Sequence, residues 1–242
     1  EQRRAIAAVA FAHLAGWCYY AAGVRLPVIR SEALYLDHVQ YRPDPEKKIL
    51  FIRTSFWGTF TGTHFKAILN RLLWNNHLPL SCTFLSNHDF LEYEEMATFH
   101  AAVLVPIVNY VMSFDEFYSI GMPLFLPNRE WLTKLFMYSA YTTFATAVFN
   151  PVVRTSMVEN QSLGMDMALH VEGTSLEHDP DDFRVYYFWH SLGPFGMYPY
   201  VMDFDSVPDL LDQMMKLDRS SAQALNAGMK SFVSRSRIHT LG

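Results

Sequence analysis

Short apolar runs alternate with stretches of helical spacing along residues 48–126. A run of about four to eight apolar residues between turn signals predicts a buried strand, whereas apolar residues roughly three or four positions apart predict a helix. Strands are predicted at residues 48–53, 80–85, 101–107 and 122–126, and helices between them at residues 64–74, 89–99 and 113–120. Strands and helices that alternate with short connections predict an α/β fold, with an open parallel sheet and helices on both faces.

The pattern continues to the C-terminus with one interruption. The remaining predicted elements are helices at residues 130–147, 183–190 and 220–237 and a strand at residues 200–204. Asp205 or Ser206 is the predicted cap of a further helix near Pro208, because small polar residues and a first-turn proline favour a helix start. Residues 150–182 are irregular and polar, which is typical of a functional or mobile loop.

Residues 1–47 carry a different pattern. A helix is predicted over residues 3–22 and ends at Gly23, since glycine is favoured just beyond a helix C-terminus. The polar, proline-containing segment Arg42-Pro-Asp-Pro-Glu46 then marks a boundary. We therefore expect a Rossmann-like α/β domain at residues 48–242, preceded by a helix and linker that belong to an earlier domain.

Composition agrees with a folded chain and excludes some partners. Half of the 242 residues are hydrophobic and 15% are aromatic, so a buried core is expected. The net charge of −5 and the scattered basic residues argue against nucleic acid as a partner. Cys18 and Cys82 are interpreted as buried thiols. The apolar run at residues 5–24 is rich in alanine and interrupted by His13 and Gly16, which favours a packed helix over a membrane anchor.

Several well-marked site motifs are absent from the sequence. It contains no GxxxxGK[ST] phosphate loop, no GxSxG elbow, no HExxH and no GxGxxG turn. His178 and the aspartates up to Asp182 are interpreted as a solvated acidic loop rather than a metal site. Asp203-Phe-Asp205 has the DxD form that holds a metal–nucleotide in some glycosyltransferases, but Asp205 is better explained as a helix cap. No metal is therefore expected.

The loop after the first predicted strand is the first candidate site. The residues in it that suit ligand binding are Arg53, Ser55, Gly58, Thr59, Gly62 and Thr63. Ligands of open α/β sheets bind at the carboxyl ends of the strands. Glycines permit close backbone approach, and hydroxyls, helix N–H groups and an arginine suit a diphosphate. The alternative is a wide turn whose threonines cap the next helix.

The second candidate site follows the third predicted strand. There Ser113-Phe-Asp-Glu116 opens a short helix, and Gly121-Met-Pro123 leads from it into the next strand. A helix N-terminus attracts anions, and a carboxylate one turn further along can accept hydrogen bonds from a diol. Alternatively, Ser113 is the N-cap and Glu116 its capping-box partner, because Ser-x-x-Glu is the sequence of such a box.

The order of strand, proline, Ser-x-x-Glu helix, Gly-x-Pro turn and apolar strand resembles the donor-binding segment of GT-B glycosyltransferases, and in outline the exostosin branch. More loosely, residues 48–237 resemble glycosyltransferase-like proteins of algae and protists. The resemblance implies that Ser113 and Phe114 lie beside the diphosphate of a nucleotide-sugar and that Glu116 holds its ribose hydroxyls. Val108 stands where retaining members often carry a second glutamate.

The resemblance also implies an activity and a setting. It implies hexosyl transfer from a nucleotide-sugar, an acceptor-binding domain before this one, and the Golgi lumen as compartment; otherwise the cytoplasm is expected. The nucleotide-sugar is a substrate, and no cofactor is expected. Two other interpretations stay open: a non-catalytic binding or scaffold module of the same fold and, with no supporting motif, an oxidoreductase or hydrolase.

Overall fold

The computed structural model describes residues 23–28, 33–85, 91–106, 111–139 and 193–241, together with the single residues Ala15, Tyr19, Asp89, Phe183 and Tyr187. The chain divides into two compact units. One unit comprises Glu1–Ser31 and Thr133–Met197, and the other comprises Glu32–Leu132 and Tyr198–Gly242. The second unit contains the sheet and every predicted site residue, and we call it the sheet unit.

The sheet unit is built on a five-stranded parallel sheet with the strand order β2-β1-β3-β4-β5. The strands are β1 (Lys48–Phe51), β2 (Ser81–Phe84), β3 (Ala101–Val103), β4 (Leu124–Pro127) and β5 (Met202–Phe204). The central strands β1, β3 and β4 are almost entirely buried, as expected for a parallel sheet covered on both faces. The predicted α/β fold with an open parallel sheet is therefore confirmed.

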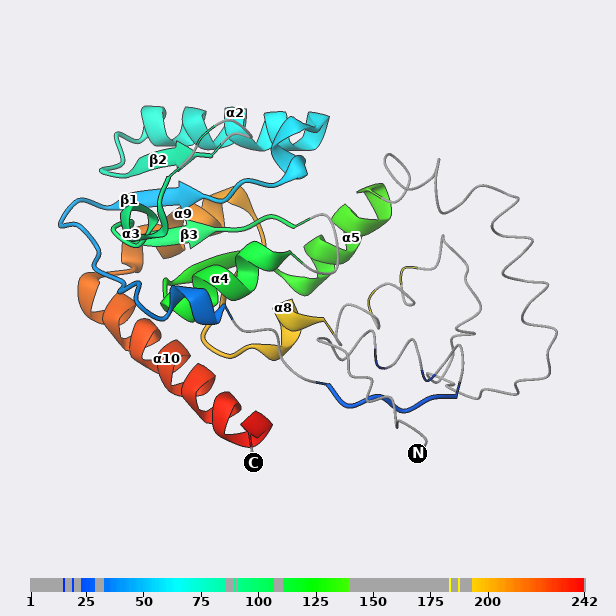
Figure 1. The fold of residues 1–242 in the computed structure, drawn as a ribbon. Coiled ribbons are helices and arrows are strands. Elements are labelled where there is room, and N and C mark those ends of the chain that lie inside the picture. The colour runs from blue at the N-terminus through cyan, green and yellow to red at the C-terminus, as the bar shows by residue number, and fades with distance from the viewer. Residues whose placement is uncertain are drawn as a thin grey trace, which may run out of the picture. The chain divides into compact units, whose positions relative to one another are not determined.

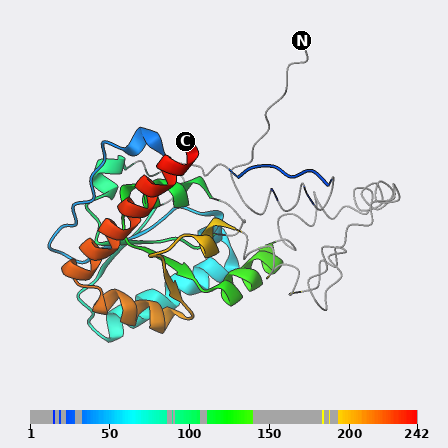
Figure 2. The same cartoon turned by 90° about the horizontal axis from the view of Figure 1, so that it is seen from below.

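Helices lie on both faces of this sheet (Figures 1 and 2). The helices are α2 (Phe60–Asn75), α3 (Tyr93–Met96), α4 (Met112–Ile120), α9 (Val207–Lys216) and α10 (Arg219–Leu241). Helix α2 packs against α9, and α4 packs against α10. Helix α2 leads from β1 to β2 at one edge of the sheet, and α4 leads from β3 to β4 in the opposite direction, so right-handed crossovers place these two helices on opposite faces.

Some predicted helix boundaries were wrong. Helix α2 begins at Phe60 rather than His64, because the Thr59 hydroxyl accepts a hydrogen bond from the Gly62 N–H at 3.0 Å and caps the helix there. Helix α3 begins at Tyr93, so the helix predicted from residue 89 is much shorter. It ends at a turn in which the Thr98 N–H donates to the Glu95 carbonyl oxygen at 3.1 Å.

The end of α4 at Gly121 was predicted correctly. Gly121 has a φ of 79°, which is the left-handed conformation that glycine adopts without steric cost. Its N–H donates to the Phe117 carbonyl oxygen at 3.1 Å, and its own carbonyl oxygen accepts from the Asn226 side chain of α10 at 2.9 Å. The same residue therefore ends α4 and joins it to α10.

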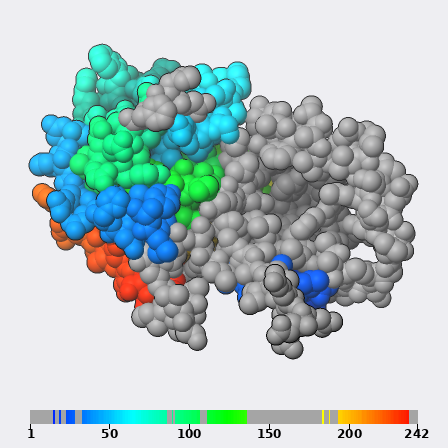
Figure 3. Space-filling model, in the orientation of Figure 1, coloured from blue at the N-terminus to red at the C-terminus, as the bar shows by residue number. Residues whose placement is uncertain are grey.

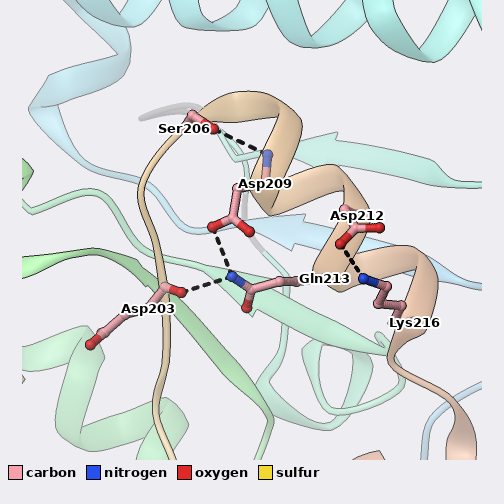
Figure 4. A network of polar contacts seen from close by, with 6 residues as sticks. All are labelled: Asp203, Ser206, Asp209, Asp212, Gln213 and Lys216. Carbon is pink, nitrogen blue, oxygen red and sulfur yellow. Dashed lines mark hydrogen bonds and ion pairs between the residues drawn. The ribbon is translucent and has the colours of Figure 1, made fainter.

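A polar network surrounds the start of α9 (Figure 4). The Ser206 hydroxyl accepts from the Asp209 N–H at 3.2 Å, while Asp209 Oδ2 accepts from the Asp205 N–H at 3.1 Å. Gln213 Nε2 donates to the same Asp209 oxygen and to the Asp203 carbonyl oxygen. Of the two predicted caps Ser206 is therefore the N-cap, and the interpretation of Asp205 as the cap was wrong.

His100 connects the start of β3 to the junction of α9 and α10. Its side chain is only 3% exposed, and its Nε2 lies 3.0 Å from the Leu217 carbonyl oxygen. Burial lowers the pKa of His100 below its ordinary value of 6.5, because removal from water disfavours the charged ring. We therefore assign a neutral imidazole that donates from Nε2 to Leu217.

This histidine predicts a pH dependence of stability. Since its folded-state pKa is lowered, the unfolded chain binds the proton more readily. The contribution of neutral His100 is fully present above pH ~6.5 and is lost as the pH falls below that value. Denaturant melts at pH 7.5, 6.5 and 5.5 should show a steeper loss of unfolding free energy for the wild type than for His100→Gln, whose amide can still donate. Equal slopes would contradict this assignment.

The other unit is described only in parts. Gly23 has a φ of 64° and donates its N–H to the Tyr19 carbonyl oxygen at 2.8 Å, which confirms it as the end of a helix. Short helix α8 (Pro194–Met197) and part of α5 (Arg129–Ser139), which starts one residue earlier than predicted, also belong here. The polar stretch at residues 150–182 lies outside the described residues. No helix within the described part of the chain is both long and apolar enough to span a bilayer.

Candidate functional site

The two candidate loops leave adjacent strands at the same edge of the sheet. Strands β1 and β3 are hydrogen-bonded neighbours, with Phe51 opposite Val103 and the Ile52 N–H donating to the Val103 carbonyl oxygen at 2.9 Å. The chain then turns to α2 on one face and to α4 on the other. This is the topological switch point of a doubly wound sheet, where ligands of such folds bind outside the carboxyl ends of the strands.

The first residues after β1 lie at this edge. The side chains of Arg53 and Ser55 are exposed, and Ser55 begins the short 3₁₀ helix η2 (Ser55–Gly58). Between them the Thr54 hydroxyl oxygen is buried and has no hydrogen-bond partner among the described residues. Buried polar atoms without a partner are uncommon in folded proteins, so the Thr54 hydroxyl is a candidate ligand contact. No sequence motif had indicated it.

The two threonines predicted to bind a ligand, Thr59 and Thr63, instead hold the backbone of their own loop. Besides capping α2, the Thr59 hydroxyl donates to the Phe56 carbonyl oxygen at 2.7 Å, and the Thr63 hydroxyl donates to the Thr59 carbonyl oxygen at 3.0 Å. These bonds match the alternative interpretation of the loop, in which threonines cap the next helix. The exposed groups at the edge are therefore Arg53, Ser55 and the backbone of η2.

The two glycines of the loop differ sharply. An added Cβ at Gly62 would overlap the Phe56 carbonyl oxygen and lie 3.0 Å from the Trp57 Cα. Gly62 is therefore needed where α2 packs on η2. An added Cβ at Gly58 would meet nothing within 4 Å, so this exposed glycine borders open space. Only Gly58 lies where a ligand could approach the backbone.

The first turn of α4 is not a capping box. Its N-cap is Val111, which is extended and makes no side-chain capping bond, and Ser113 is the second residue of the helix. The Phe114 N–H donates to the Val111 carbonyl oxygen at 2.9 Å, so the first turn closes on Val111. The prediction that Ser113 caps the helix was wrong, and Ser113 is a partly exposed hydroxyl within the first turn.

Phe114 is part of the core rather than of the sheet edge. Its side chain is 0% exposed and packs against Tyr198, with 5.1 Å between the ring centroids. Tyr198 also contacts Tyr118 of α4 and Phe232 of α10. This aromatic cluster fixes α4 against α10. Phe114 therefore holds the first turn of α4 in place, and its side chain is directed away from solvent.

Glu116 lies one turn further along α4 and contacts a segment before the sheet. The Tyr35 hydroxyl, in the 3₁₀ helix η1 (Leu34–Leu36), donates to Glu116 Oε1. Tyr93 of α3 packs edge-on against Tyr35 at 6.3 Å between ring centroids. Figure 3 shows the blue surface of the η1 segment beside the green surface of the chain that follows β2. Sequence reasoning did not predict this contact, because Tyr35 and Glu116 lie 81 positions apart in the chain.

Both tyrosines remain protonated at neutral pH. Burial raises the pKa of Tyr93, and a hydrogen bond to the Glu116 carboxylate and the charge of this group raise it further. The same three causes, in the same order, raise the pKa of Tyr35. Neutral phenols donate hydrogen bonds, so the carboxylate of Glu116 is held from the side of η1 and α3.

The described residues contain no candidate metal site. Among the residues that the structure describes, no three His, Cys, Asp or Glu side chains are grouped so that they could hold a metal ion. The acidic segment at residues 178–182 lies outside the described part. Cys82 is a free cysteine on β2, and burial raises its pKa to about 12, which makes it unreactive as a nucleophile.

Comparison with known proteins adds no family. No protein-family model, no curated protein and no solved structure matches the chain. The functional assignment therefore rests on the geometry of the sheet unit.

Proposed function

We propose that the sheet unit binds the nucleotide-sugar donor of a glycosyltransferase at the carboxyl edge between β1 and β3. The observation that carries this proposal is the switch point, which brings the exposed Arg53 and Ser55 and the first turn of α4 to one edge of the sheet. In doubly wound sheets this is the position at which nucleotides bind. The resemblance of the segment from Ser113 to Pro123 to GT-B donor sites supports the same assignment.

Each group at this edge has a role in the proposal. The N–H groups of the first turn of α4 and the Ser113 hydroxyl face the diphosphate, and the positive end of the helix dipole favours its charge. Arg53 neutralises the diphosphate from β1, and the η2 backbone near Gly58 lets it approach. The unpartnered Thr54 hydroxyl is a further polar group at this edge. Glu116, one turn along α4, accepts from the ribose hydroxyls.

The chemistry in this proposal is stabilisation of a leaving group. In hexosyl transfer the bond between the anomeric carbon and the diphosphate oxygen breaks, and negative charge builds up on the nucleoside diphosphate. Preorganised N–H groups and Arg53 stabilise that charge more strongly as it develops. The base that activates the acceptor would come from an acceptor-binding domain. The proposal itself requires no metal or cofactor.

A non-catalytic nucleotide-binding module is the second candidate. Val108 in place of a sugar-facing glutamate favours it, although Val108 lies outside the described residues. This candidate shares the nucleotide site and differs only in lacking turnover. A nucleotide-sugar hydrolysis or transfer assay on the full chain separates the two.

Nucleoside diphosphates are expected to raise the melting temperature of the protein. A ligand at 100 times its Kd stabilises the native state by about 2.7 kcal/mol. A thermal-shift panel of UDP, GDP, ADP and inorganic pyrophosphate measures this directly. Arg53→Gln should reduce the shift for every compound, whereas Arg71→Gln, an exposed arginine on α2, should leave it unchanged. The absence of any shift with all four compounds would overturn the proposal.

A further inference from the structure

We infer that Tyr35, from the segment before the sheet, forms the nucleoside-facing side of the proposed site: its exposed ring packs against the base and its hydroxyl orients Glu116. This inference rests on the proposed function and extends it from the diphosphate to the nucleoside. It also gives a binding role to residues that the sequence marks only as a linker.

The position of Tyr35 is set by contacts on two sides. Its hydroxyl donates to Glu116 Oε1 on α4. Its ring packs in a T-shaped arrangement against Tyr93 on α3, with an angle of 66° between the ring planes. Helix η1 packs directly on α4. The segment that follows η1 is held to the start of β3, since the Arg42 and Asp44 N–H groups donate to the Ala97 and Thr98 carbonyl oxygens. Tyr35 is therefore an ordered part of the sheet unit.

Tyr35 is accessible to a ligand. The residue is 55% exposed although its hydroxyl is engaged with Glu116. Met112, one turn before Glu116 on the same side of α4, is 63% exposed. Two exposed apolar side chains, Met112 on α4 and Tyr35 on η1, thus flank the Glu116 carboxylate.

The chemistry of this surface suits a nucleoside. Aromatic faces stack on bases of any sequence, and a carboxylate accepts both hydroxyls of a ribose diol. A carboxylate has about four acceptor positions, so Glu116 can still accept from a diol while it accepts from Tyr35 and Tyr93. The carboxylate lies about one helical turn, ~5.4 Å along the axis, from the first turn of α4, where the diphosphate is proposed. Phosphates, ribose and base would then follow one another along α4.

Titration calorimetry of the full chain with UDP, GDP and inorganic pyrophosphate tests the inference. Tyr35→Ala removes the ring and the hydroxyl and should weaken the better of the two nucleotides about tenfold or more, because stacking on the base is lost. Tyr35→Phe keeps the ring and should weaken that nucleotide less. Pyrophosphate has no nucleoside, so its affinity should be the same in all three proteins. His38→Ala, an exposed neighbour on the same segment, should bind like the wild type.

The possible outcomes separate this inference from the proposed function. Wild-type binding of a nucleotide that is unchanged in Tyr35→Ala would overturn the role of Tyr35 and leave the proposed function standing. An equal loss of nucleotide and pyrophosphate affinity in Tyr35→Ala would identify a structural clasp and would also overturn the inference. No binding of any compound by the wild type would overturn the proposed function and the inference together.

Discussion

Gly62→Ala is expected to destabilise the sheet unit by about 1–3 kcal/mol. The added Cβ would overlap the Phe56 carbonyl oxygen and lie 2.8 Å from its carbonyl carbon, both of them backbone atoms. Backbone atoms cannot rotate away as a flexible side chain does, so η2 must shift relative to α2. The measurement is the free energy of unfolding from urea melts monitored by far-UV circular dichroism.

The expected cost of this change has two sources. Overpacking of a well-packed site costs typically ~1–3 kcal/mol. A shift of η2 also strains the bonds that Phe56 accepts from the Thr59 N–H and hydroxyl, at 2.9 and 2.7 Å, and loss of a helix cap costs ~1 kcal/mol. Alanine is about 1 kcal/mol better than glycine within a helix, which offsets part of the loss.

Gly58→Ala is the matched control on the same loop. It adds the same methyl group four positions earlier, where nothing lies within 4 Å, and the stability should change by less than ~0.5 kcal/mol. In the proposed site Gly58→Ala should instead weaken binding of a nucleoside diphosphate, because the methyl group occupies the space the diphosphate enters. Equal stability of the two alanine variants would show that Gly62 is not packed against η2.

The sequence predicted the fold of the sheet unit well because its strands are short, buried and apolar. The runs at β1, β3 and β4 are buried on both faces, so their composition alone marks them as strands of a parallel sheet. Helix starts were harder to predict, since they depend on which side chain caps. Thr59 moved the start of α2 by a whole turn, and that bond is a matter of local geometry rather than of apolar spacing.

Motif spacing alone wrongly predicted Ser113 as a helix cap. Ser113-x-x-Glu116 has the required spacing, yet its first turn closes on Val111. Ser206-x-x-Asp209 has a comparable spacing and does form the serine cap, because the Ser206 backbone is extended with φ −157° and ψ 165° just before Val207. The Asp209 side chain accepts from the Asp205 N–H, one residue before the N-cap. The backbone conformation at the serine decides between the two, and this conformation depends on how the preceding loop leaves the strand.

Sequence reasoning correctly placed the two candidate loops at one edge of the sheet. It did not predict that Tyr35 contacts Glu116 there. The edge follows from strand order, which right-handed crossovers and the carboxyl ends of parallel strands largely determine. The contact between Tyr35 and Glu116 depends on how the segment before β1 folds back over α3 and α4. No short-range pattern encodes that path, so the role of Tyr35 required the three-dimensional structure.

Phe114→Ala is expected to cost about 3–5 kcal/mol of stability, the usual range for truncating a buried phenylalanine. The ring is fully buried and packs against Tyr118 and Tyr198 at 5.8 and 5.1 Å between centroids, so its removal leaves a cavity between α4 and the chain before β5. Met112→Ala, an exposed position in the same turn, should change stability by less than ~0.5 kcal/mol. Urea melts of the two variants measure this difference.

Nucleotide binding separates a core role for Phe114 from a ligand-contacting one. Because its side chain is directed into the core, a folded Phe114→Ala protein should still gain stability from a saturating nucleoside diphosphate, by nearly the same increment as the wild type. A substitution that removes a ligand contact, such as Arg53→Gln, should have the opposite effect. The stability without ligand should stay the same, and the stability gained from the nucleoside diphosphate should fall. A small loss of stability in Phe114→Ala combined with a lost increment would mean that the ring faces the ligand. The proposal that only the backbone of this turn and Ser113 meet the diphosphate would then be wrong.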